Sequence, residues 1–247
     1  MGARSSTGLA GAEGDVGIYS FGPTKHLEVG GGALCFSDAG LAAESRRALA
    51  SLGVSPASEV QEAQRRFRTG LNVAREALRA GPHAENRPFA GLLTGYEAAL
   101  RVEWRPEWGS LIATALRDFP EALDRRREKA AAWGTIALSA GLVPVGMGLG
   151  SAPWRFACRL LGADWASQHA VGERLRSTGL NVSHWYLPGH FLMGAALGSL
   201  PGVERLAQEV FQFWVDDRTS LEEISGSLGA VVDAVRWRAA LGQRPAG

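Results

Sequence analysis

Short apolar runs alternate with longer amphipathic segments along this chain, and that alternation restricts the folds open to it. The runs GIYSF (17–21) and GALCFS (32–37) have the length and composition of strands, whereas 56–80 carries its apolar residues at helical spacing. In the last hundred residues, VPVGMG and PWRFACRLL are typical of strands, and WASQHAVGERLRSTG is typical of a helix. Strands interleaved with helices predict an α/β fold.

Capping residues and prolines set the expected limits of the other elements. Asp38 is placed to cap a helix that Gly53 ends, and a further helix is expected over roughly 89–101. A third begins near Pro106, breaks around Pro120 and continues. Near the C-terminus, NVSHWYL predicts a strand, whereas GVERLAQEVFQFWV and SLEEISGSLGAVVDAV predict two helices, the second opening on a capping box of Ser220 and Glu223.

The composition of the 247 residues argues against several classes of protein. Lys and Arg number 26 against 25 for Asp and Glu, a net charge of +1, whereas a general nucleic-acid binder needs clustered cations. The run of arginines at 125–127 is interpreted as a solvated helix face. No stretch reaches the roughly 18 apolar residues of a membrane span, and no leader pattern opens the chain, so we expect neither membrane insertion nor export.

Cysteine and glycine usage add two expectations. Cys35 and Cys158 each lie within an apolar run, so both are expected to be buried and reduced, which suits a cytoplasmic protein. The chain has 32 glycines, many of them in the first thirty-odd residues and at 143–151. Glycine concentrated near strand ends indicates sharp turns or close approach to a ligand.

Lys25 is the residue that we single out for chemistry. It follows the apolar run that ends at Phe21 and lies in the Gly- and Pro-containing loop GPTKHLEVGG. A lysine held in tight, partly apolar surroundings loses some preference for its charged form and becomes a candidate Schiff-base amine. A nearby serine hydroxyl and loop amides can hold a phosphate. On position alone, a solvent-exposed loop lysine is the alternative interpretation.

The segment GDVGIYSFGPTKHLEVGGGALCFSD resembles the lysine segment of the DegT/StrS family, PLP-dependent aminotransferases of fold type I that act mostly on nucleotide-linked keto-sugars. The family pattern is roughly G-D-x-x-x-x-S-F-x-x-T-K-x-L-x-x-G-E-G-G. The residues that match it are Gly14, Asp15, Ser20, Phe21, Thr24, Lys25, Leu27, Gly30 and Gly32. Further along, LDRRREKAAAW resembles the long helix of the family, SHWYLPGHF resembles its H-Y-x-x-P-x-H segment, and the last forty-odd residues resemble its closing helix, short strand and helix.

The resemblance covers about 15–53 and 106–238 and implies a partial PLP-transferase type I fold. Residues 1–119 would be a remnant of the large PLP-binding domain with a helical insertion at about 54–105, and 120–247 would be the small α/β domain. Lys25 would form the Schiff base with pyridoxal 5'-phosphate and shuttle the proton, Ser20 would contact the cofactor phosphate, and His190 would lie on the substrate side. The implied reaction moves an amino group from a small-molecule donor to a keto-sugar or similar carbonyl compound, in a protein that works as a dimer.

The departures from the family pattern concern the cofactor domain. The family lysine lies far into its chain, after the phosphate turn, the aromatic stacked on the pyridine ring and the aspartate that pairs with the ring nitrogen. No residue ahead of Lys25 here stands at the spacing of that aspartate, and without it the electron-sink chemistry of PLP is weaker. Gly31 stands where the family has Glu, and Trp104-Arg105-Pro106 stands near the expected place of its N-Y-R motif.

Two readings of function therefore stay open. In one, the chain is a PLP-dependent aminotransferase with Lys25 as its Schiff-base residue. In the other, it is a truncated or split, non-catalytic relative that serves as a binding or assembly subunit and needs a partner chain carrying the missing half. Both expect an oligomer, because GIYSF and GALCF resemble doubly covered parallel strands whose neighbours are absent here. The alternative to an oligomer is that the insertion folds back over the exposed face, with Phe67, Leu71 and Phe89 as its covering residues.

The histidines give no metal site by spacing. His184 and His190 are six residues apart, and a metal would need a third ligand that the sequence does not identify. Packing or hydrogen bonding is the expected role of His184. His26, beside the lysine, either lines the cofactor pocket or lies in solvent, and His83 and His169 carry no functional signal.

Overall fold

The computed structural model describes residues 2–4, 6, 8–22, 24–79, 89, 91–103, 105–146, 148, 150–184 and 186–241. These divide into two compact units, each described by itself. Unit 1 comprises Met1–Gln61, Ala98–Glu128 and Met147–Trp154, and unit 2 comprises Glu62–Glu97, Lys129–Gly146 and Arg155–Gly247. The units are not contiguous in sequence, and the division into domains 1–119 and 120–247 stays a prediction.

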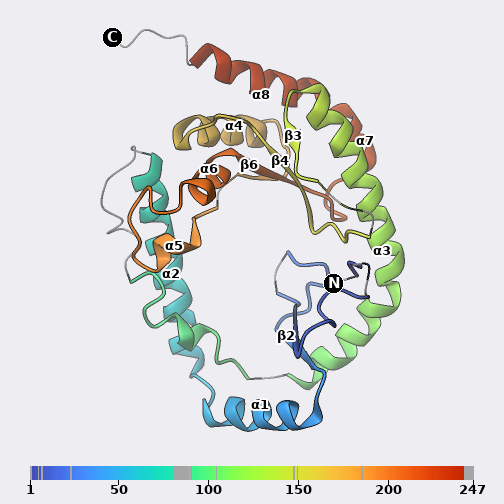
Figure 1. Cartoon of the computed structure of the whole chain (residues 1–247), viewed down its shortest axis with the longest axis vertical. Coiled ribbons are helices and arrows are strands. Elements are labelled where there is room, and N and C mark those ends of the chain that lie inside the picture. The colour runs from blue at the N-terminus through green and yellow to red at the C-terminus, as the bar shows by residue number, and fades with distance from the viewer. Residues whose placement is uncertain are drawn as a thin grey trace. The chain divides into compact units, whose positions relative to one another are not determined.

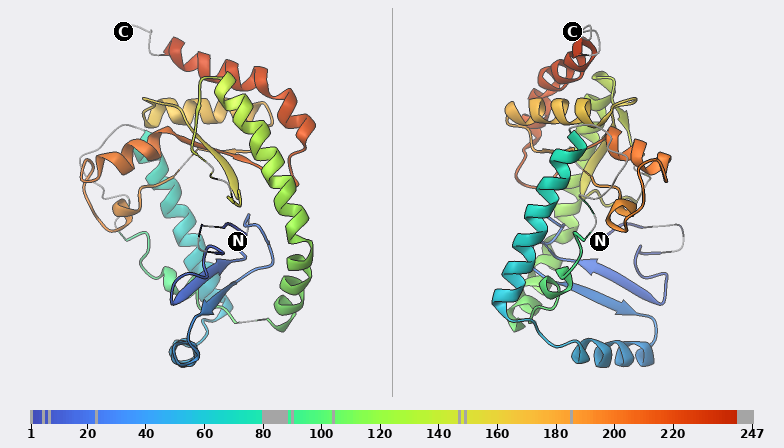
Figure 2. Two further views of the ribbon diagram at one scale, coloured as in Figure 1. Left: turned by 45° about the vertical axis from the view of Figure 1, so that its right-hand side comes forward. Right: turned by 90° about the vertical axis from the view of Figure 1, so that its left-hand side faces the viewer.

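Unit 1 is built on an antiparallel pair of strands. β1 (Val16–Ser20) pairs with β2 (Gly32–Phe36), with Val16 opposite Phe36 and Ser20 opposite Gly32, and Figure 2 shows them as neighbouring blue arrows. The strands lie where the sequence predicts them, but the parallel arrangement was wrong. Helix α1 (Ala39–Ser51) follows, and the Asp38 side chain accepts a hydrogen bond from the Leu41 amide, as the predicted cap requires.

Pro120 does not break the third helix. α3 (Pro106–Ser139) continues through it, which corrects the expected interruption. A proline within a helix loses one hydrogen bond and crowds the preceding turn, so neighbouring contacts must hold the helix together. Phe119 and Leu123 supply them, since both are buried against Phe21 and Leu27 in the core of unit 1.

Unit 2 contains a four-stranded antiparallel sheet in the order β3-β4-β6-β5. The strands are β3 (Val143–Pro144), β4 (Arg155–Arg159), β5 (Val182–Ser183) and β6 (Val210–Trp214). Successive side chains of β4 and β6 point to opposite faces, so Phe156 and Cys158 share one face with Phe211 and Phe213. That face carries the main core of the unit.

Helices cover the apolar face of this sheet. The C-terminal part of α3 contributes Trp133, whose ring stacks on Phe213 with centroids 4.3 Å apart. α4 (Trp165–Ser177), α7 (Leu221–Gly226) and α8 (Leu228–Leu241) add Val171, Ile224 and Val231 to the same buried cluster, and Figure 1 shows α4 and α8 on one side of β4 and β6. Ser220 and Glu223 form the predicted capping box of α7.

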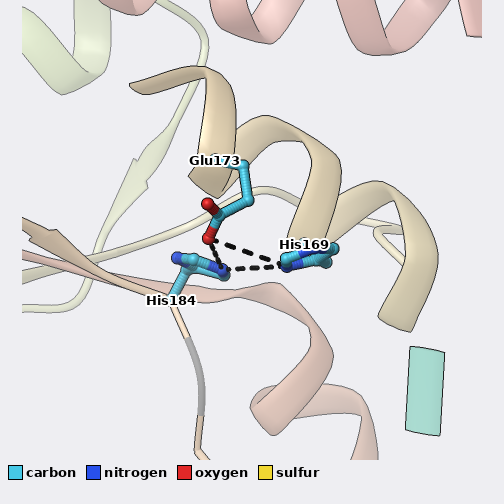
Figure 3. Close-up of side chains that lie close together, drawn as sticks. All are labelled: His169, Glu173 and His184. Atoms are coloured by element: carbon cyan, nitrogen blue, oxygen red, sulfur yellow. Dashed lines mark hydrogen bonds and ion pairs between the residues drawn. The ribbon is translucent and has the colours of Figure 1, made fainter. Parts of the chain in front are cut away.

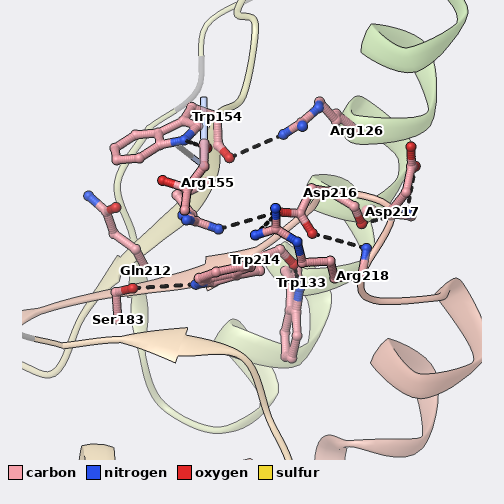
Figure 4. A network of polar contacts seen from close by, with 12 residues as sticks. Arg126, Trp133, Trp154, Arg155, Ser183, Gln212, Trp214, Asp216, Asp217 and Arg218 are labelled. Atoms are coloured by element: carbon pink, nitrogen blue, oxygen red, sulfur yellow. Dashed lines mark hydrogen bonds and ion pairs between the residues drawn. The ribbon is translucent and has the colours of Figure 1, made fainter. Parts of the chain in front are cut away.

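The opposite face of the sheet is polar and aromatic. The Arg155 guanidinium lies 3.6 Å from the centroid of the Trp214 ring, and its Nη1 is 3.6 Å from Oδ2 of the buried Asp216. Figure 4 shows these groups with Arg218, which also lies over the Trp214 ring. The pairing offsets the cost of burying a charge at this end of β4.

The remaining helices are α2 (Ala57–Arg79), α5 (Gly189–Leu192), α6 (Pro201–Glu209) and the 3₁₀ turn η2 (Tyr96–Ala99). The helix expected over 89–101 is wrong, because Gly91 and Gly95 have positive φ values and only η2 forms among the described residues there. The helix expected over 202–215 is also wrong in its second half, which is strand β6. Cys158 is buried as expected, but Cys35 is exposed.

Two further expectations need correction in detail. Arg125 and Arg127 are exposed, whereas Arg126 is 9% exposed, so the arginine run is only partly a solvated face. Phe89, expected to cover the strands of unit 1, stacks instead on Phe191 within unit 2, with ring centroids 5.3 Å apart. None of the described helices combines the length and the apolar character needed to cross a bilayer.

Candidate active-site loop

The Lys25 loop connects β1 to β2 and is closed by backbone hydrogen bonds. The Phe21 amide donates to the Gly31 carbonyl at 3.0 Å, and the Phe21 carbonyl accepts from the amides of Val29 and Gly30. The side chains of Phe21 and Leu27 are buried in the core of unit 1 and fasten the loop to it. Phe21 and Leu27, the two apolar residues that flank Lys25 in the motif, therefore act as anchors.

Glycine is required at the return of this loop. Gly30 has a φ of 107°, and a Cβ at this position would lie 3.4 Å from the Trp108 ring. At Gly32, an added Cβ would lie 2.7 Å from the Tyr19 carbonyl oxygen. The positive φ at Gly30 and the close approach of the Tyr19 carbonyl at Gly32 thus each disfavour a side chain.

The side chain of Lys25 is half-buried and lies on an aromatic ring. Its Nζ is 4.0 Å from the centroid of the Trp154 indole, and the indole Nε1 donates to the carbonyl of Thr24. A cation over an indole face is attracted by about 0.5–1 kcal/mol. Trp154 therefore fixes both the backbone and the amine of the residue that the sequence singles out.

His26 is half-buried and held in place by two contacts. Its Nε2 lies 3.2 Å from the Ala152 carbonyl oxygen, and its ring meets the edge of Phe119 at a centroid distance of 5.8 Å. Burial, together with the positive charges of the N-terminus and Arg126, lowers the pKa of His26 from 6.5 to about 4. The solvent-exposed alternative for His26 is thus wrong, and its imidazole is neutral at pH 7.

Ser20 lies at the end of β1 with an exposed side chain, and its Oγ accepts a hydrogen bond of 3.5 Å from the Gly22 amide. The antiparallel register places Ser20 on the same sheet face as Val16 and Ile18, opposite Gly32, Phe36 and Leu34 respectively. Ile18 is 77% exposed, so this face is apolar and open among the residues that the structure describes. The other face carries Tyr19 and Ala33 against the core.

His190 belongs to unit 2, at the start of the short helix α5. Its Nε2 is 3.0 Å from Oε1 of Glu204, a buried carboxylate that also accepts from the Gly198 amide at 2.9 Å. Its Nδ1 is buried and has no hydrogen-bond partner among the described residues. The imidazole is therefore oriented by one carboxylate and keeps one nitrogen for another contact.

His184 is not brought together with His190. It lies directly after β5, fully buried, with its Nε2 3.4 Å from Nδ1 of His169. His184 and His190, six residues apart in sequence, thus lie in two separate environments. The neighbour of His184 is His169, which carried no signal in the sequence.

Lysine is scarce in this protein. Lys25 and Lys129 are the two lysines of the sequence. Lys129 is buried; its Nζ donates to the Asp216 carbonyl at 2.8 Å and lies 3.5 Å from a carboxylate oxygen of Asp217. Lys25 is thus the half-buried one of the two, with its amine on an indole face.

Trp154 and Ala152 are site residues that sequence reasoning missed. Both lie more than a hundred residues after Lys25, and neither spacing nor periodicity relates the two segments. The one available hint is that 143–151 is rich in glycine, which indicated a close backbone approach in that region.

Comparison with known proteins gives matches in fold. No family model matches the sequence, and no curated protein gives a significant match. Spr1654 of Streptococcus pneumoniae, assigned as a sugar aminotransferase, has a TM-score of 0.67 at 14% identity in its PMP form, over 98% of this chain and 57% of its own. The aminotransferase TlmJ of Streptoalloteichus hindustanus has a TM-score of 0.65 at 25% identity, over 97% of this chain and 56% of its own.

A DegT DnrJ EryC1 StrS aminotransferase of Brucella abortus has a TM-score of 0.58 at 16% identity, over 93% of this chain and 53% of its own. The chain thus spans little more than half the length of each of these structures. Nearly all of it is matched, which agrees with the expected C-terminal portion. The fold is therefore a partial PLP-transferase fold shared with these aminotransferases, as the family resemblance implies.

Proposed function

We propose that this chain carries the Schiff-base lysine of a PLP-dependent aminotransferase that transfers an amino group to a keto-sugar or similar carbonyl compound. The observation that carries the proposal is the Lys25 loop: its motif, its anchoring by Phe21 and Leu27, and its position within a fold shared with sugar aminotransferases. The second lysine, Lys129, is occupied in the core of unit 2.

The residues of the loop suit one edge of a PLP site. Lys25 offers a primary amine that Trp154 holds in a partly apolar place, and Ser20 offers an exposed hydroxyl and the nearby Gly22 amide to a phosphate. PLP, when bound, supplies the electron sink that lets an amino acid exchange its amino group for a carbonyl. In this proposal Lys25 would hold the cofactor through its Nζ amine, and the same nitrogen would hold the proton that moves during the exchange.

His190 is the proposed contact on the substrate side. Glu204 fixes its ring through Nε2, and Nδ1 is the atom that remains for a polar group of the substrate. The amino donor and the sugar are small molecules in this proposal, as the family resemblance implies.

The proposal also assigns a partner to the open face of β1 and β2. That face places Ser20 beside Val16, Ile18, Leu34 and Phe36, an apolar patch next to the proposed phosphate contact. A second copy, or a chain with the complementary part of the fold, would cover this patch and complete the site. Size-exclusion chromatography with light scattering tests the assignment: a stable monomer that binds no apolar dye would contradict it.

The test of the function is a PLP titration of the purified chain. Wild type should develop the visible absorbance of a PLP Schiff base, and borohydride should fix a pyridoxyl group that peptide mass spectrometry locates on Lys25. Lys25→Ala should lose both signals, and Lys25→Arg, which keeps the charge over Trp154 but cannot form the adduct, should lose them too. An adduct on Lys129, or a full spectrum in either variant, would refute the role of Lys25.

A further inference from the structure

Two histidines and a glutamate meet at one point of unit 2, and none of them is among the residues proposed for the cofactor. His169 and Glu173 lie four residues apart on one face of α4, and His184 approaches from the end of β5, as Figure 3 shows. Nδ1 of His169, Oε1 of Glu173 and Nε2 of His184 are within 4.8 Å of one another.

The three distances form a nearly regular triangle. Nδ1 of His169 is 3.4 Å from Nε2 of His184 and 3.9 Å from Oε1 of Glu173, and Nε2 of His184 is 3.6 Å from the same oxygen. A point equidistant from the three atoms lies about 2.1 Å from each, within the range of Zn–N and Zn–O bonds in proteins.

A glycine makes room for this convergence. Gly172 is buried within α4, and a Cβ there would lie 2.2 Å from Cγ of His184. Glycine inside a helix costs about 1 kcal/mol relative to alanine, so the helix gives up stability for the close approach of this ring. Phe211 stacks on the His184 ring, with centroids 6.1 Å apart, and limits its movement.

The three side chains of the cluster differ in their exposure to solvent. The side chain of His184 is 2% exposed, that of His169 is 24% exposed and that of Glu173 is 49% exposed. A metal held by the three would keep one side toward solvent, where a water can complete four-fold coordination. Arg176 bonds Oε1 of Glu173 through Nη1 at 3.4 Å and the Val182 carbonyl through Nε at 3.0 Å, so it fastens the carboxylate to the strand beside His184.

We propose that His169, Glu173 and His184 bind one divalent transition-metal ion, Zn²⁺ by preference, with a water as fourth ligand. Two imidazoles and one carboxylate suit Zn²⁺, whereas Mg²⁺ and Ca²⁺ favour oxygen ligands. The ion links α4 to the segment after β5 and stabilises unit 2. The site does not depend on the proposed cofactor chemistry.

The experiment is calorimetric titration of Zn²⁺ into the untagged, chelator-treated full chain, with Co²⁺ spectra as a second readout. Wild type should bind one ion and gain thermal stability. His169→Ala and Glu173→Gln alter the exposed side of the site, so both should fold while binding Zn²⁺ at least about tenfold more weakly.

Two control variants separate this site from other ligands. Glu222→Gln changes an exposed glutamate of α7, and Cys35→Ser removes the exposed thiol, so both should bind like wild type. Absence of binding by wild type, or wild-type affinity in either His169→Ala or Glu173→Gln, would overturn the proposal. A thiolate charge-transfer band in the Co²⁺ spectrum would overturn it too, because the three ligands contain no sulfur.

Discussion

Gly172→Ala should destabilise the protein even though alanine is the better helix former. The added Cβ would lie 2.2 Å from Cγ, 2.3 Å from Nδ1 and 2.5 Å from Cδ2 of His184. Ordinary contact needs the ring to retreat by about 1 Å, and Phe211 packs on the ring, so the cost is that of overpacking, about 1–3 kcal/mol. The gain in helix propensity, about 1 kcal/mol, opposes it.

Gly134→Ala is the matched control for this experiment. Gly134 lies within α3, and its added Cβ would meet Phe156 at 3.8 Å, which is ordinary contact. The propensity gain is common to both substitutions, so the difference in unfolding free energy isolates the clash with His184. Urea denaturation followed by circular dichroism should place Gly172→Ala about 1–3 kcal/mol below Gly134→Ala. Equal stability, or a more stable Gly172→Ala, would refute the reasoning.

Three other predictions concern pH, a buried carboxylate and turnover. Burial lowers the pKa of His26 from 6.5 to about 4, so on acidification the unfolded chain takes up a proton before the folded chain does, and the free energy of unfolding should fall as the pH drops from about 6.5 towards 4. His26→Gln should lose this part of the pH dependence. An NMR titration of the His26 ring with a midpoint near 6.5 would contradict the prediction. Glu204→Leu leaves the Gly198 amide without its acceptor and should lower the free energy of unfolding, measured with denaturant, by about 1–3 kcal/mol. Glu204→Gln keeps an oxygen there and should lose less. Equal losses in the two variants would argue against the hydrogen bond. The isolated chain should transaminate weakly or not at all, because no acidic residue precedes Lys25 at the family spacing, and robust turnover in an amino-transfer assay would disprove that.

Local signals predicted local structure well. Asp38 and the pair Ser220–Glu223 cap helices as their spacing indicated, because a capping side chain acts on amides two or three residues away. The two apolar runs around Lys25 are strands, which their short length and apolar composition also indicated locally. The two strands were expected to be parallel but pair antiparallel. Apolar residues on both faces also occur in a hairpin with one exposed face, and Ile18 lies exposed on that face here.

Contacts distant in sequence could not be predicted. Pro120 stays inside α3 because Phe119 and Leu123 find partners in the Lys25 loop, a compensation that no propensity reveals. By periodicity alone VFQFW continues the helical pattern before it, whereas the family resemblance implies a short strand there. Its alternating burial, with Phe211 and Phe213 inward, is that of a strand between two others. Trp154 could not be predicted as a neighbour of Lys25, because only the folded chain brings these two distant residues together.

The scarcity of lysine has a practical consequence. With Lys129 buried and bonded, an amine-reactive reagent meets Lys25 and the chain's α-amino group as its principal targets. Once the α-amino group is blocked, a fluorophore or crosslinker therefore labels one defined loop, with no engineering of the sequence. An aldehyde bound at Lys25 would reduce labelling by such a reagent, so the extent of labelling would measure how much of the loop is occupied. A crosslinker attached to Lys25 would show which surface lies nearest to it in an assembly.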